Sequence, residues 1–308
     1  MEKNLLKDYK IGILAGGSSH ERAVSLKSGT AVKLALERIG LNVIFLDVKE
    51  ETFCALIDEN NIDVAFIALH GKFGEDGTVQ RILEAKNILY TGSGPDASGL
   101  AMDKLRSKKV FETSAISIPG YQALSKDQDI NSVDIGYPCV VKPVNEGSSI
   151  GLSIVLSESV MADAIDKARV FGGEVIIEKF IEGRELTIGV LDNVPLPVVE
   201  IITACGIYDF KAKYESCSTR YVVPADLNEI SCKYLQGIGL KAHRALGCRG
   251  FSRVDVRMDA DGQAYVLEVN TIPGLTERSL FPMAAKAGGF DFSRLCIKML
   301  YEAVSRAE

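Results

Sequence analysis

The chain has 308 residues, of which 47% are hydrophobic and 25% charged, as is typical of a globular protein with two or three structural units. Its formal net charge of -6 disfavours a nucleic-acid backbone as the main partner. Seven scattered cysteines without paired metal-type spacing are typical of a reducing cytosol. No signal peptide or membrane-spanning run is recognisable, so we expect a cytoplasmic enzyme with neither membrane nor nucleic acid as partner.

The first part of the chain alternates between strand and helix patterns. Strands are predicted at 10–15, 43–48 and 64–69, with helices between them, the first over 25–39. This order predicts a parallel sheet that binds ligands at the carboxyl ends of its strands. Two of those ends carry polar, glycine-rich segments, 16–21 and 70–77, that can approach a ligand closely. A dinucleotide fold is the alternative, but Gly-x-Gly-x-x-Gly is missing after the first strand, which disfavours a nicotinamide site.

A second unit is predicted after a helix over 95–114. Strands are predicted at 137–143, 151–156 and 174–180, with a helix over 158–171. The connection between the first two strands contains Gly-Ser-Ser-Ile-Gly at 147–151, whose backbone N–H groups and hydroxyls could fold over phosphates. An ordinary hairpin loop is the alternative. Neither a Walker A loop nor the protein-kinase motifs occur anywhere in the chain.

Several charged residues of this region interrupt apolar runs. Lys142 is the only charge within 138–144 and shares a strand face with Val140, so its ammonium must either reach solvent or meet an anion. Glu-Lys-Phe at 178–180 ends another apolar strand with an acceptor, a donor and a ring, which could hold adenine, although charges often simply end a strand. The irregular, glycine-free segment 208–216 is either a functional loop or a solvated surface loop.

Two further strands are predicted near the end of the chain, at 251–258 and 263–270. They are separated by Asp261-Gly262, a strong signal for a two-residue hairpin turn. Such a turn places four polar side chains on one face, with Asp255 opposite Glu268 and Arg253 opposite Asn270. The other face is a predicted core face and carries Val254, Val256, Met258, Tyr265, Leu267 and Val269.

The polar face of this hairpin predicts a metal site. Two carboxylates about 5 Å apart across a ladder repel each other unless something compensates. Oxygens of Asp255, Glu268 and Asn270 that converge on one point suit a hard divalent cation such as Mg²⁺. The alternative is a solvated polar face on which Arg253 and Arg257 neutralise the acids.

A series of motifs resembles the ATP-grasp ligases and, within them, the D-alanine–D-alanine ligase family. The ATP-grasp motifs are Lys-Pro at 142–143, Glu-Gly-Ser-Ser-Ile-Gly at 146–151, Glu-Lys at 178–179, Arg-Val-Asp at 253–255 and Glu-Val-Asn-Thr-Ile-Pro-Gly at 268–274. The motifs of the narrower family lie at 16–25, 69–77, 90–94, 102–106 and 213–214. The resemblance runs from about residue 10 to 300. It implies an α/β and α+β protein with an N-terminal Rossmann-like parallel sheet (1–102) and a two-lobed ATP-grasp fold, comprising a central lobe (103–183) and a C-terminal lobe with the metal site (184–308).

The resemblance also implies an activity. Members of the family join two D-alanines to D-alanyl-D-alanine through an acyl phosphate, releasing ADP and phosphate, for peptidoglycan precursor synthesis. ATP and two Mg²⁺ or Mn²⁺ ions are the implied cofactors, and a homodimer in the cytoplasm is the implied state. A D-alanine–D-lactate or D-alanine–D-serine ligase is one alternative, although Tyr214 after Lys213 resembles the dipeptide-forming branch. A nucleotide-binding regulator with a dead site is another, and it is disfavoured because the polar residues of the site are present together.

Residue roles follow from the same resemblance. The ATP-binding residues it implies are Lys104, Lys142, Glu178, Lys179, Phe180, Glu185 and Lys213, with Ser148, Ser149 and Gly151 in the loop that closes over the phosphates. The metal ligands it implies are Asp255, Glu268 and Asn270. For the amino acids it implies Glu21, Ser148 and Tyr214 at the first D-alanine, His70 near it, Arg253 and the backbone of Gly274 at the oxyanion, and Ser279 with Leu280 at the carboxylate of the second D-alanine. One departure is Ala23, where many members carry Glu; we expect it to affect only a peripheral contact.

Overall fold

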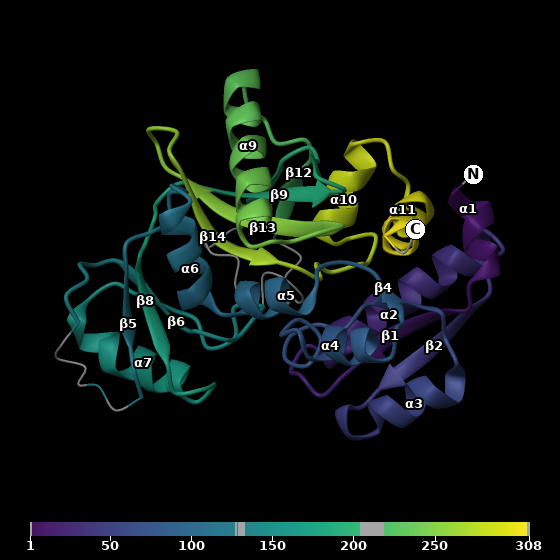
Figure 1. Ribbon diagram of the computed structural model, residues 1–308. Helices are drawn as coiled ribbons and strands as arrows, with labels where there is room; N and C mark the ends of the chain where they lie inside the picture. Colours follow the sequence, from purple (N-terminus) through teal and green to yellow (C-terminus); the bar gives the residue numbers. More distant parts are fainter. Residues whose placement is uncertain (1, 127, 129–132, 204–218, 307–308) are drawn as a thin grey trace.

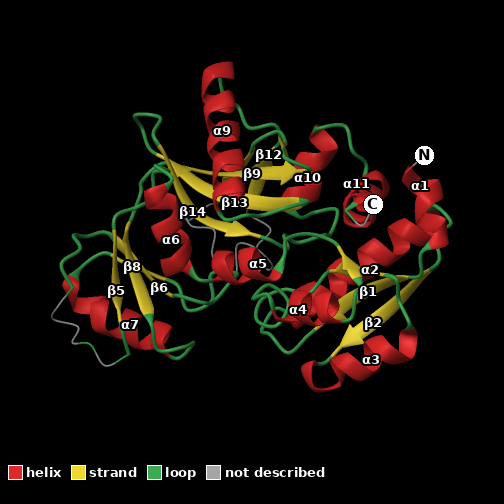
Figure 2. Cartoon of the chain, in the orientation of Figure 1, coloured by secondary structure: helices red, strands yellow, loops and turns green. Residues whose placement is uncertain are grey.

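The computed structural model describes residues 2–126, 128, 133–203 and 219–306 and contains three sheets in successive parts of the chain (Figure 1). Figure 2 shows the third sheet, in yellow, above the other two, with the second sheet on the left and the first on the right. The first sheet is parallel and the other two are antiparallel. The predicted mixture of α/β and α+β architecture is confirmed. No helix among the described residues is long and apolar enough to span a membrane.

The first sheet has four parallel strands, in the order β2 (Val43–Val48), β1 (Ile11–Gly16), β3 (Val64–Ile67) and β4 (Leu89–Tyr90). Its helices are α1 (Glu2–Leu5), α2 (Arg22–Arg38), α3 (Phe53–Asn60) and α4 (Thr78–Ala85), with 3-10 turns η1 (Leu6–Asp8) and η2 (Glu50–Thr52). Every residue of β1 is buried, as expected for a strand that is covered on both faces. Because β1 lies between β2 and β3, the connections that leave β1 and β3 diverge at a topological switch point, where open α/β sheets bind ligands.

The single helix predicted over 95–114 is divided into α5 (Pro95–Met102) and α6 (Lys104–Thr113). Asp103 separates them because its carboxylate accepts hydrogen bonds of 3.0 Å from two backbone N–H groups in the first turn of α6. The break puts Lys104 at the start of α6, where its Nζ donates a 2.6 Å hydrogen bond to the carbonyl oxygen of Glu146. The sequence analysis did not predict this cap, which ends one helix and begins the next at Lys104.

The second sheet is antiparallel and has the order β5 (Tyr121–Leu124), β8 (Val175–Lys179), β6 (Cys139–Pro143) and β7 (Ser153–Val155). Its helical segments are η4 (Glu158–Val160) and α7 (Met161–Arg169), which together account for the predicted helix over 158–171. Apolar side chains of β6, β7 and β8 pack against α7 to form a separate small core. The strands predicted in this region are confirmed, with ends shortened by one or two residues.

The third sheet is also antiparallel and has the order β12 (Arg220–Val222), β11 (Val199–Ile202), β9 (Arg184–Leu191), β13 (Phe251–Met258) and β14 (Ala264–Asn270), with β10 (Val194–Pro195) paired to β9. Its helices are α9 (Glu229–Ala245), α10 (Leu280–Ala287) and α11 (Phe292–Ser305). In Figure 1, α9 stands over the sheet, whereas α11 lies beside the N-terminal unit. There α11 packs against α2, β3 and β4, so the last helix completes the core of the first unit.

The turn of the β13–β14 hairpin differs from the predicted one. The backbone N–H of Asp259 donates a 3.0 Å hydrogen bond to the carbonyl oxygen of Gln263, which leaves three residues, 260–262, in the loop. Gly262 has a φ of +81°, the left-handed conformation that a three-residue hairpin loop requires. The predicted two-residue turn at Asp261-Gly262 was therefore wrong.

A β-bulge in β14 compensates for the extra loop residue, so that the pairing of β13 with β14 beyond the bulge is the predicted one. The pairing shifts by one residue after Asp255, so that Asp255 still pairs with Glu268 and Arg253 with Asn270, as predicted. Between the bulge and the turn, a one-residue shift exchanges the two faces of β14. Ala264 and Val266 are buried in the core, whereas Tyr265 and Leu267, which were predicted on the core face, are half-buried on the other side.

Candidate active site

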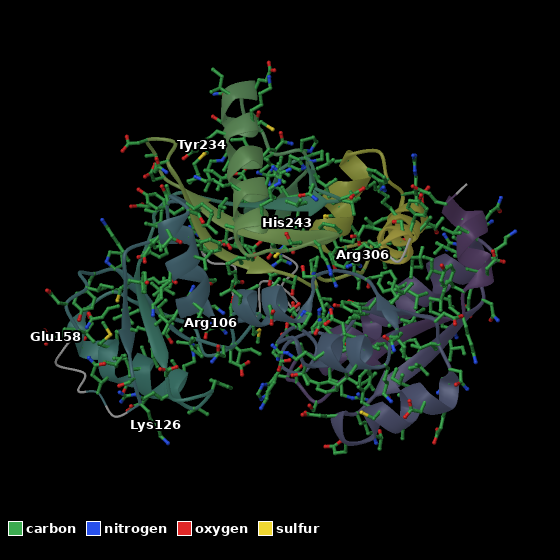
Figure 3. The ribbon with its side chains drawn as sticks, in the orientation of Figure 1. Arg106, Lys126, Glu158, Tyr234, His243 and Arg306 are labelled. Carbon is green, nitrogen blue, oxygen red and sulfur yellow. The ribbon has the colours of Figure 1, made fainter. Side chains whose placement is uncertain are left out.

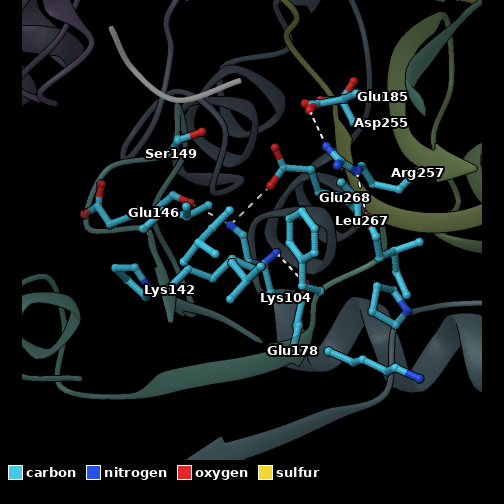
Figure 4. Close-up of a pocket in the computed structure, with 18 of the residues that line it drawn as sticks. Lys104, Lys142, Glu146, Ser149, Glu178, Glu185, Asp255, Arg257, Leu267 and Glu268 are labelled. Atoms are coloured by element: carbon cyan, nitrogen blue, oxygen red, sulfur yellow. Dashed lines mark hydrogen bonds and ion pairs between the residues drawn. The ribbon is translucent and has the colours of Figure 1, made fainter. Parts of the chain in front are cut away.

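Two cavities meet at the β13–β14 hairpin. The first lies between the second and third sheets and is lined by Lys104, Lys142, Ser149, Glu178, Lys179, Phe180, Glu185, Asp255 and Glu268 among the predicted residues (Figure 4). The second lies between the switch point of the first sheet and the third sheet, and is lined by Glu21, His70, Ser148, Arg253, Asn270, Gly274, Ser279 and Leu280. Asp255 and Glu268 thus face one cavity while Arg253 and Asn270 face the other, which places the hairpin at their junction.

Both acids of the hairpin have a cationic partner. The guanidinium of Arg253 donates to both oxygens of Asp255, with Nε–Oδ1 of 2.8 Å and Nη2–Oδ2 of 2.7 Å. Asn270 Nδ2 and Thr187 Oγ1 donate to the same carboxylate at 3.1 Å and 2.7 Å. Lys104 Nζ lies 3.5 Å from Glu268 Oε2. These contacts compensate the repulsion that two facing carboxylates would otherwise produce.

The side-chain oxygens at this junction are suitable ligands for a hard divalent cation. Asp255, Glu268 and Asn270 supply two carboxylates and one amide on adjacent strands. No group of three or more His, Cys, Asp or Glu side chains forms a metal site within residues 2–126, 128, 133–203 and 219–306. Mg²⁺ needs no such group, because it is usually held by one or two carboxylates together with the phosphates of a substrate. The chemistry of the residues therefore suits a cation that binds together with a nucleotide.

Lys142 meets an anion, which was one of the two predicted outcomes. Its Nζ lies 3.0 Å from Glu178 Oε2, and only 7% of the residue is exposed. The second oxygen of Glu178 lies 3.0 Å from the Nζ of Lys108, a residue that the sequence analysis did not identify. Lys108 follows Lys104 by four residues on the same helix, and this spacing was the available signal.

Arg257 contacts several residues that line the first cavity. Its Nη1 donates a 2.9 Å hydrogen bond to Glu185 Oε2, and its Nε donates a 3.0 Å hydrogen bond to the carbonyl oxygen of Ile181. The guanidinium carbon lies 5.1 Å from the centroid of the Phe180 ring. Figure 4 shows Arg257 beside Glu185, and Leu267 next to Glu268. Leu267 was missed as a cavity residue because the bulge that turns it away from the core has no clear sequence signal.

The loop between β6 and β7 folds onto the first unit. The hydroxyl of Ser148 donates a hydrogen bond to the carboxylate of Glu21, which is itself 7% exposed. Ser148 and Ser149 have φ values of +50° and +59°, a left-handed conformation that is uncommon for residues with side chains. Gly151 does not line the cavity among the described residues, but a Cβ at this position would lie 2.8 Å from atoms of Phe171 and Pro143. A glycine is therefore required where the chain leaves the loop.

His70 is held by hydrogen bonds at both ring nitrogens. Its Nδ1 lies 3.0 Å from the carbonyl oxygen of Ile272, which can only accept, so Nδ1 carries the proton. Its Nε2 then accepts from the hydroxyl of Ser28 at 3.1 Å, and that hydroxyl also accepts from the backbone N–H of Leu275 at 3.3 Å. Burial, the largest effect, lowers the pKa of His70 and favours this neutral form. His70 therefore orients the segment that contains Gly274.

Glu75 also faces the second cavity, although no role was assigned to it from the sequence. Its carboxylate accepts hydrogen bonds from the backbone N–H groups of Gly71 at 2.7 Å and Ile272 at 3.3 Å. Burial, followed by the charge of Glu21, raises the pKa of Glu75 to about 8. The residue ties the loop after β3 to the segment after β14. It lies within the 69–77 motif, which could have pointed to it.

The other end of the second cavity lies at the start of α10. Ser279 precedes this helix, and its Oγ lies 3.1 Å from the backbone nitrogen of Thr276 and 2.8 Å from its hydroxyl. Leu280 begins the helix and is almost fully buried. The N–H groups and the dipole at a helix N-terminus favour a carboxylate. Arg278 also lines this end and was not predicted.

Three predicted features lie apart from these cavities or outside the described structure. Lys213 and Tyr214 fall outside the described residues, so their predicted roles stay predictions. Ala23 is exposed on α2, which agrees with a peripheral position.

The chain resembles known proteins in sequence over most of its length. The family models "D-ala D-ala ligase C-terminus" and "D-ala D-ala ligase N-terminus" match residues 110–301 and 49–93. D-alanine–D-alanine ligases of Syntrophotalea carbinolica and Nitrosomonas eutropha are 44% and 46% identical to the chain. The alignments cover 99% and 94% of this chain and 100% and 95% of those proteins.

Solved structures resemble the chain as a whole. The D-alanine–D-alanine ligase of Bacillus anthracis, solved in complex with ATP, is 33% identical with a TM-score of 0.85, and the match covers 97% of this chain and 98% of that one. VanG D-Ala:D-Ser ligase of Enterococcus faecalis is 30% identical with a TM-score of 0.82, covering 95% and 99%. The sequence similarity extends over almost the full length of the chain, and the two family models match it. Together with the junction of two cavities at one hairpin, this shows that the chain belongs to the D-alanine–D-alanine ligase family.

Proposed function

We propose that the chain uses ATP to join two D-alanines into D-alanyl-D-alanine, the dipeptide of peptidoglycan precursors. The observation that carries this proposal is the junction of the two cavities at Arg253, Asp255, Glu268 and Asn270. A basic and partly apolar cavity suits a nucleotide, and a polar cavity with a carboxylate and an arginine suits amino acids. A ligase must bring the γ-phosphate of ATP to the carboxylate of an amino acid, and this junction is where the two ligands would meet.

The first chemical step is the transfer of the γ-phosphoryl group to the first D-alanine. A carboxylate is a poor electrophile, and phosphorylation converts it into a reactive acyl phosphate. Glu21 would hold the ammonium group, while Lys104 and Lys142 would balance the charge of the phosphates. Asp255, Glu268 and Asn270 would hold two Mg²⁺ or Mn²⁺ ions, which supply charge neutralisation between carboxylate and triphosphate.

The second step is the attack of the amine of the second D-alanine on the acyl phosphate, which forms the peptide bond and releases phosphate. The tetrahedral oxyanion would be stabilised by Arg253 and the backbone N–H of Gly274, both on the second cavity. Ser279 and the N-terminus of α10 would hold the carboxylate of this second D-alanine. No nucleophilic side chain is needed, which agrees with the fully hydrogen-bonded state of His70.

Water would destroy the acyl phosphate, so the site must close during the reaction. The contact between Ser148 and Glu21 supports a role for the 145–151 loop in this closure. We propose the corresponding division into a Rossmann-like unit (1–102), a central ATP-grasp lobe (103–183) and a C-terminal lobe (184–308). A homodimer in the cytoplasm completes the proposal, on family resemblance alone.

The test is ADP release by the purified chain with ATP, Mg²⁺ and D-alanine, in parallel with L-alanine, D-lactate plus D-alanine, and D-serine plus D-alanine. We expect turnover with D-alanine alone, formation of the dipeptide, and loss of activity in Glu268→Gln. Glu229→Gln, a matched change of an exposed glutamate on α9, should remain active. Turnover only with added D-lactate or D-serine would replace the dipeptide activity by one of the alternatives. No turnover with any substrate would contradict the proposal.

A further inference from the structure

Lys108 is a fully buried lysine that the reaction described above does not use. It lies on α6, none of its surface is exposed, and its Nζ is 3.0 Å from Glu178 Oε1. The ammonium also lies 5.3 Å from the centroid of the Tyr121 ring. Lysines are almost never fully buried unless they are paired, because removing the charge from water is unfavourable. A lysine in a surface ion pair contributes little to stability. A fully buried lysine such as Lys108 must instead be held by a specific anion, here Glu178.

That partner carries two lysines. Glu178 is 2% exposed, and Lys142 approaches its other oxygen at 3.0 Å. Burial alone would raise the pKa of Glu178, but the charges of Lys142 and Lys108 together bring it below its ordinary value. Burial is also the main reason why the pKa of Lys108 is lowered. A single carboxylate therefore stands between two cations in a buried cluster.

The two lysines are not equivalent with respect to the first cavity. Lys142 and Glu178 line it, whereas Lys108 is absent from the described residues that do so. Lys142 retains some exposure and Lys108 has none. A polyphosphate in the cavity can therefore attract Lys142 but cannot reach Lys108. When Lys142 turns to such an anion, Glu178 would lose one of its two partners, and Lys108 would be the cation that remains.

We propose that Lys108 is a positioning residue for ATP: it holds the Glu178 carboxylate in place from behind, so that Lys142 is free to bind the phosphates. This inference rests on the proposed function and extends it to a residue outside the cavity. Without Lys108, Lys142 would be the sole counter-ion of the buried Glu178 carboxylate among the residues that the structure describes. Its transfer to ATP would then leave Glu178 buried and unpaired, and ATP binding would carry that cost.

The test compares Lys108→Met with the matched control Lys109→Met, which removes an exposed lysine from the next position of the same helix. Steady-state kinetics would be measured with ATP and with D-alanine as the varied substrate. For K108M we expect the KM for ATP to rise about tenfold, while the KM for D-alanine changes less than twofold. Lys108→Arg, which keeps the charge, should restore most of the ATP affinity. K109M should behave as the unaltered chain.

A double variant provides the decisive comparison. If Lys108 acts through Glu178, the KM for ATP of K108M/E178Q should equal that of E178Q alone, because no carboxylate remains to be held. The double variant has no buried carboxylate at position 178 that would need a counter-ion. We therefore expect it to fold even if K108M does not, and the comparison can still be made. An additional increase beyond E178Q would show that Lys108 acts by another route and would overturn the inference. An unchanged KM for ATP in folded K108M, or equal losses for both substrates, would do the same.

Failure of the proposed function is distinguishable from failure of this inference. If the unaltered chain and K109M both release ADP in response to D-alanine, the ligase activity stands whatever K108M shows. If neither does so, the function itself is wrong. In that case, calorimetric titration of ADP into K108M and K109M still tests the role of Lys108, with about tenfold weaker binding expected in K108M alone and equal binding in the two variants contradicting it.

Discussion

Ser148 donates a hydrogen bond to the carboxylate of Glu21, although 127 positions separate the two residues in the sequence. Ser148 belongs to the loop between β6 and β7, and Glu21 precedes α2 at the switch point of the first sheet. The bond therefore joins the central unit to the N-terminal unit across the second cavity, which both residues line. The carboxylate of Glu21 is the group proposed to hold the ammonium of the first D-alanine. Glu21 would therefore take part both in substrate binding and in the closure of the loop.

Removing the hydroxyl should weaken this link. We expect Ser148→Ala to lower kcat/KM for D-alanine by about tenfold or more, since a hydrogen bond to a charged group contributes about 1.5–3 kcal/mol. The KM for ATP should change less. Ser159→Ala removes an exposed hydroxyl that interacts with Ser157 and is the matched control. Equal activity of S148A and S159A would contradict a role for the contact.

Replacing an acid at the hairpin should separate activity from stability. In Glu268→Gln we expect activity to fall more than a hundredfold, because a proposed ligand of the divalent cation is lost. The melting temperature without nucleotide should change little, since the change removes both the repulsion between Glu268 and Asp255 and the attraction between Glu268 and Lys104. Adding EDTA to the unaltered chain should abolish ADP release, and excess Mg²⁺ should restore it. Activity that survives EDTA would argue against the metal site.

Leu267 and Val266 are neighbours on opposite faces of β14 and should respond differently to truncation. Leu267→Ala should raise the KM for ATP several-fold with a small effect on stability, because this side chain lines the first cavity. Val266→Ala should leave the KM for ATP nearly unchanged but lower the free energy of unfolding by about 2 kcal/mol, as expected for a truncated core residue. Urea unfolding and steady-state kinetics of the two variants provide the measurement. The reverse pattern would place the bulge elsewhere in the strand.

His243 should make stability depend on pH. It is fully buried on α9 beside β13, its Nδ1 lies 2.7 Å from Ser252 Oγ, and Nε2 has no partner among the described residues (Figure 3). Burial, followed by the charge of Arg244, lowers the pKa of His243 to about 4. Between the ordinary value of about 6.5 and this value, the unfolded chain binds the proton and the folded chain does not. The contribution to stability is therefore complete above pH 6.5 and is lost as the pH falls to 4, by about 3 kcal/mol in total.

The measurement is urea unfolding of the unaltered chain, His243→Gln and His20→Gln between pH 4 and pH 7.5. The difference in unfolding free energy between the unaltered chain and H243Q should shrink as the pH falls through this window. H20Q, which changes an exposed histidine, should keep the full pH dependence. A constant difference between the unaltered chain and H243Q would show that His243 does not titrate as proposed.

Much of the fold could be predicted because its signals are local. The three apolar runs of the first unit became β1, β2 and β3, and their order with the intervening helices specifies a parallel sheet. The break at Asp103 was missed because helical periodicity continues across it, and only the cap decides that a new helix begins. The position of α11 against the first unit could not be predicted either, since nothing near residue 292 indicates which sheet will cover its apolar face.

The candidate site divides in the same way. Alternation along a strand is a covalent property, so the sequence by itself determined that Lys142 shares a face with Val140, that Arg253 shares one with Asp255, and that Glu268 shares one with Asn270. Tertiary structure alone decided the rest. The bulge that turns Leu267 into the cavity depends on how β14 packs against β13 and α9, and the burial of Lys108 depends on β8 bringing Glu178 to α6. A buried charge is stable only with its partner in place, and partners distant in sequence meet only when the chain has folded.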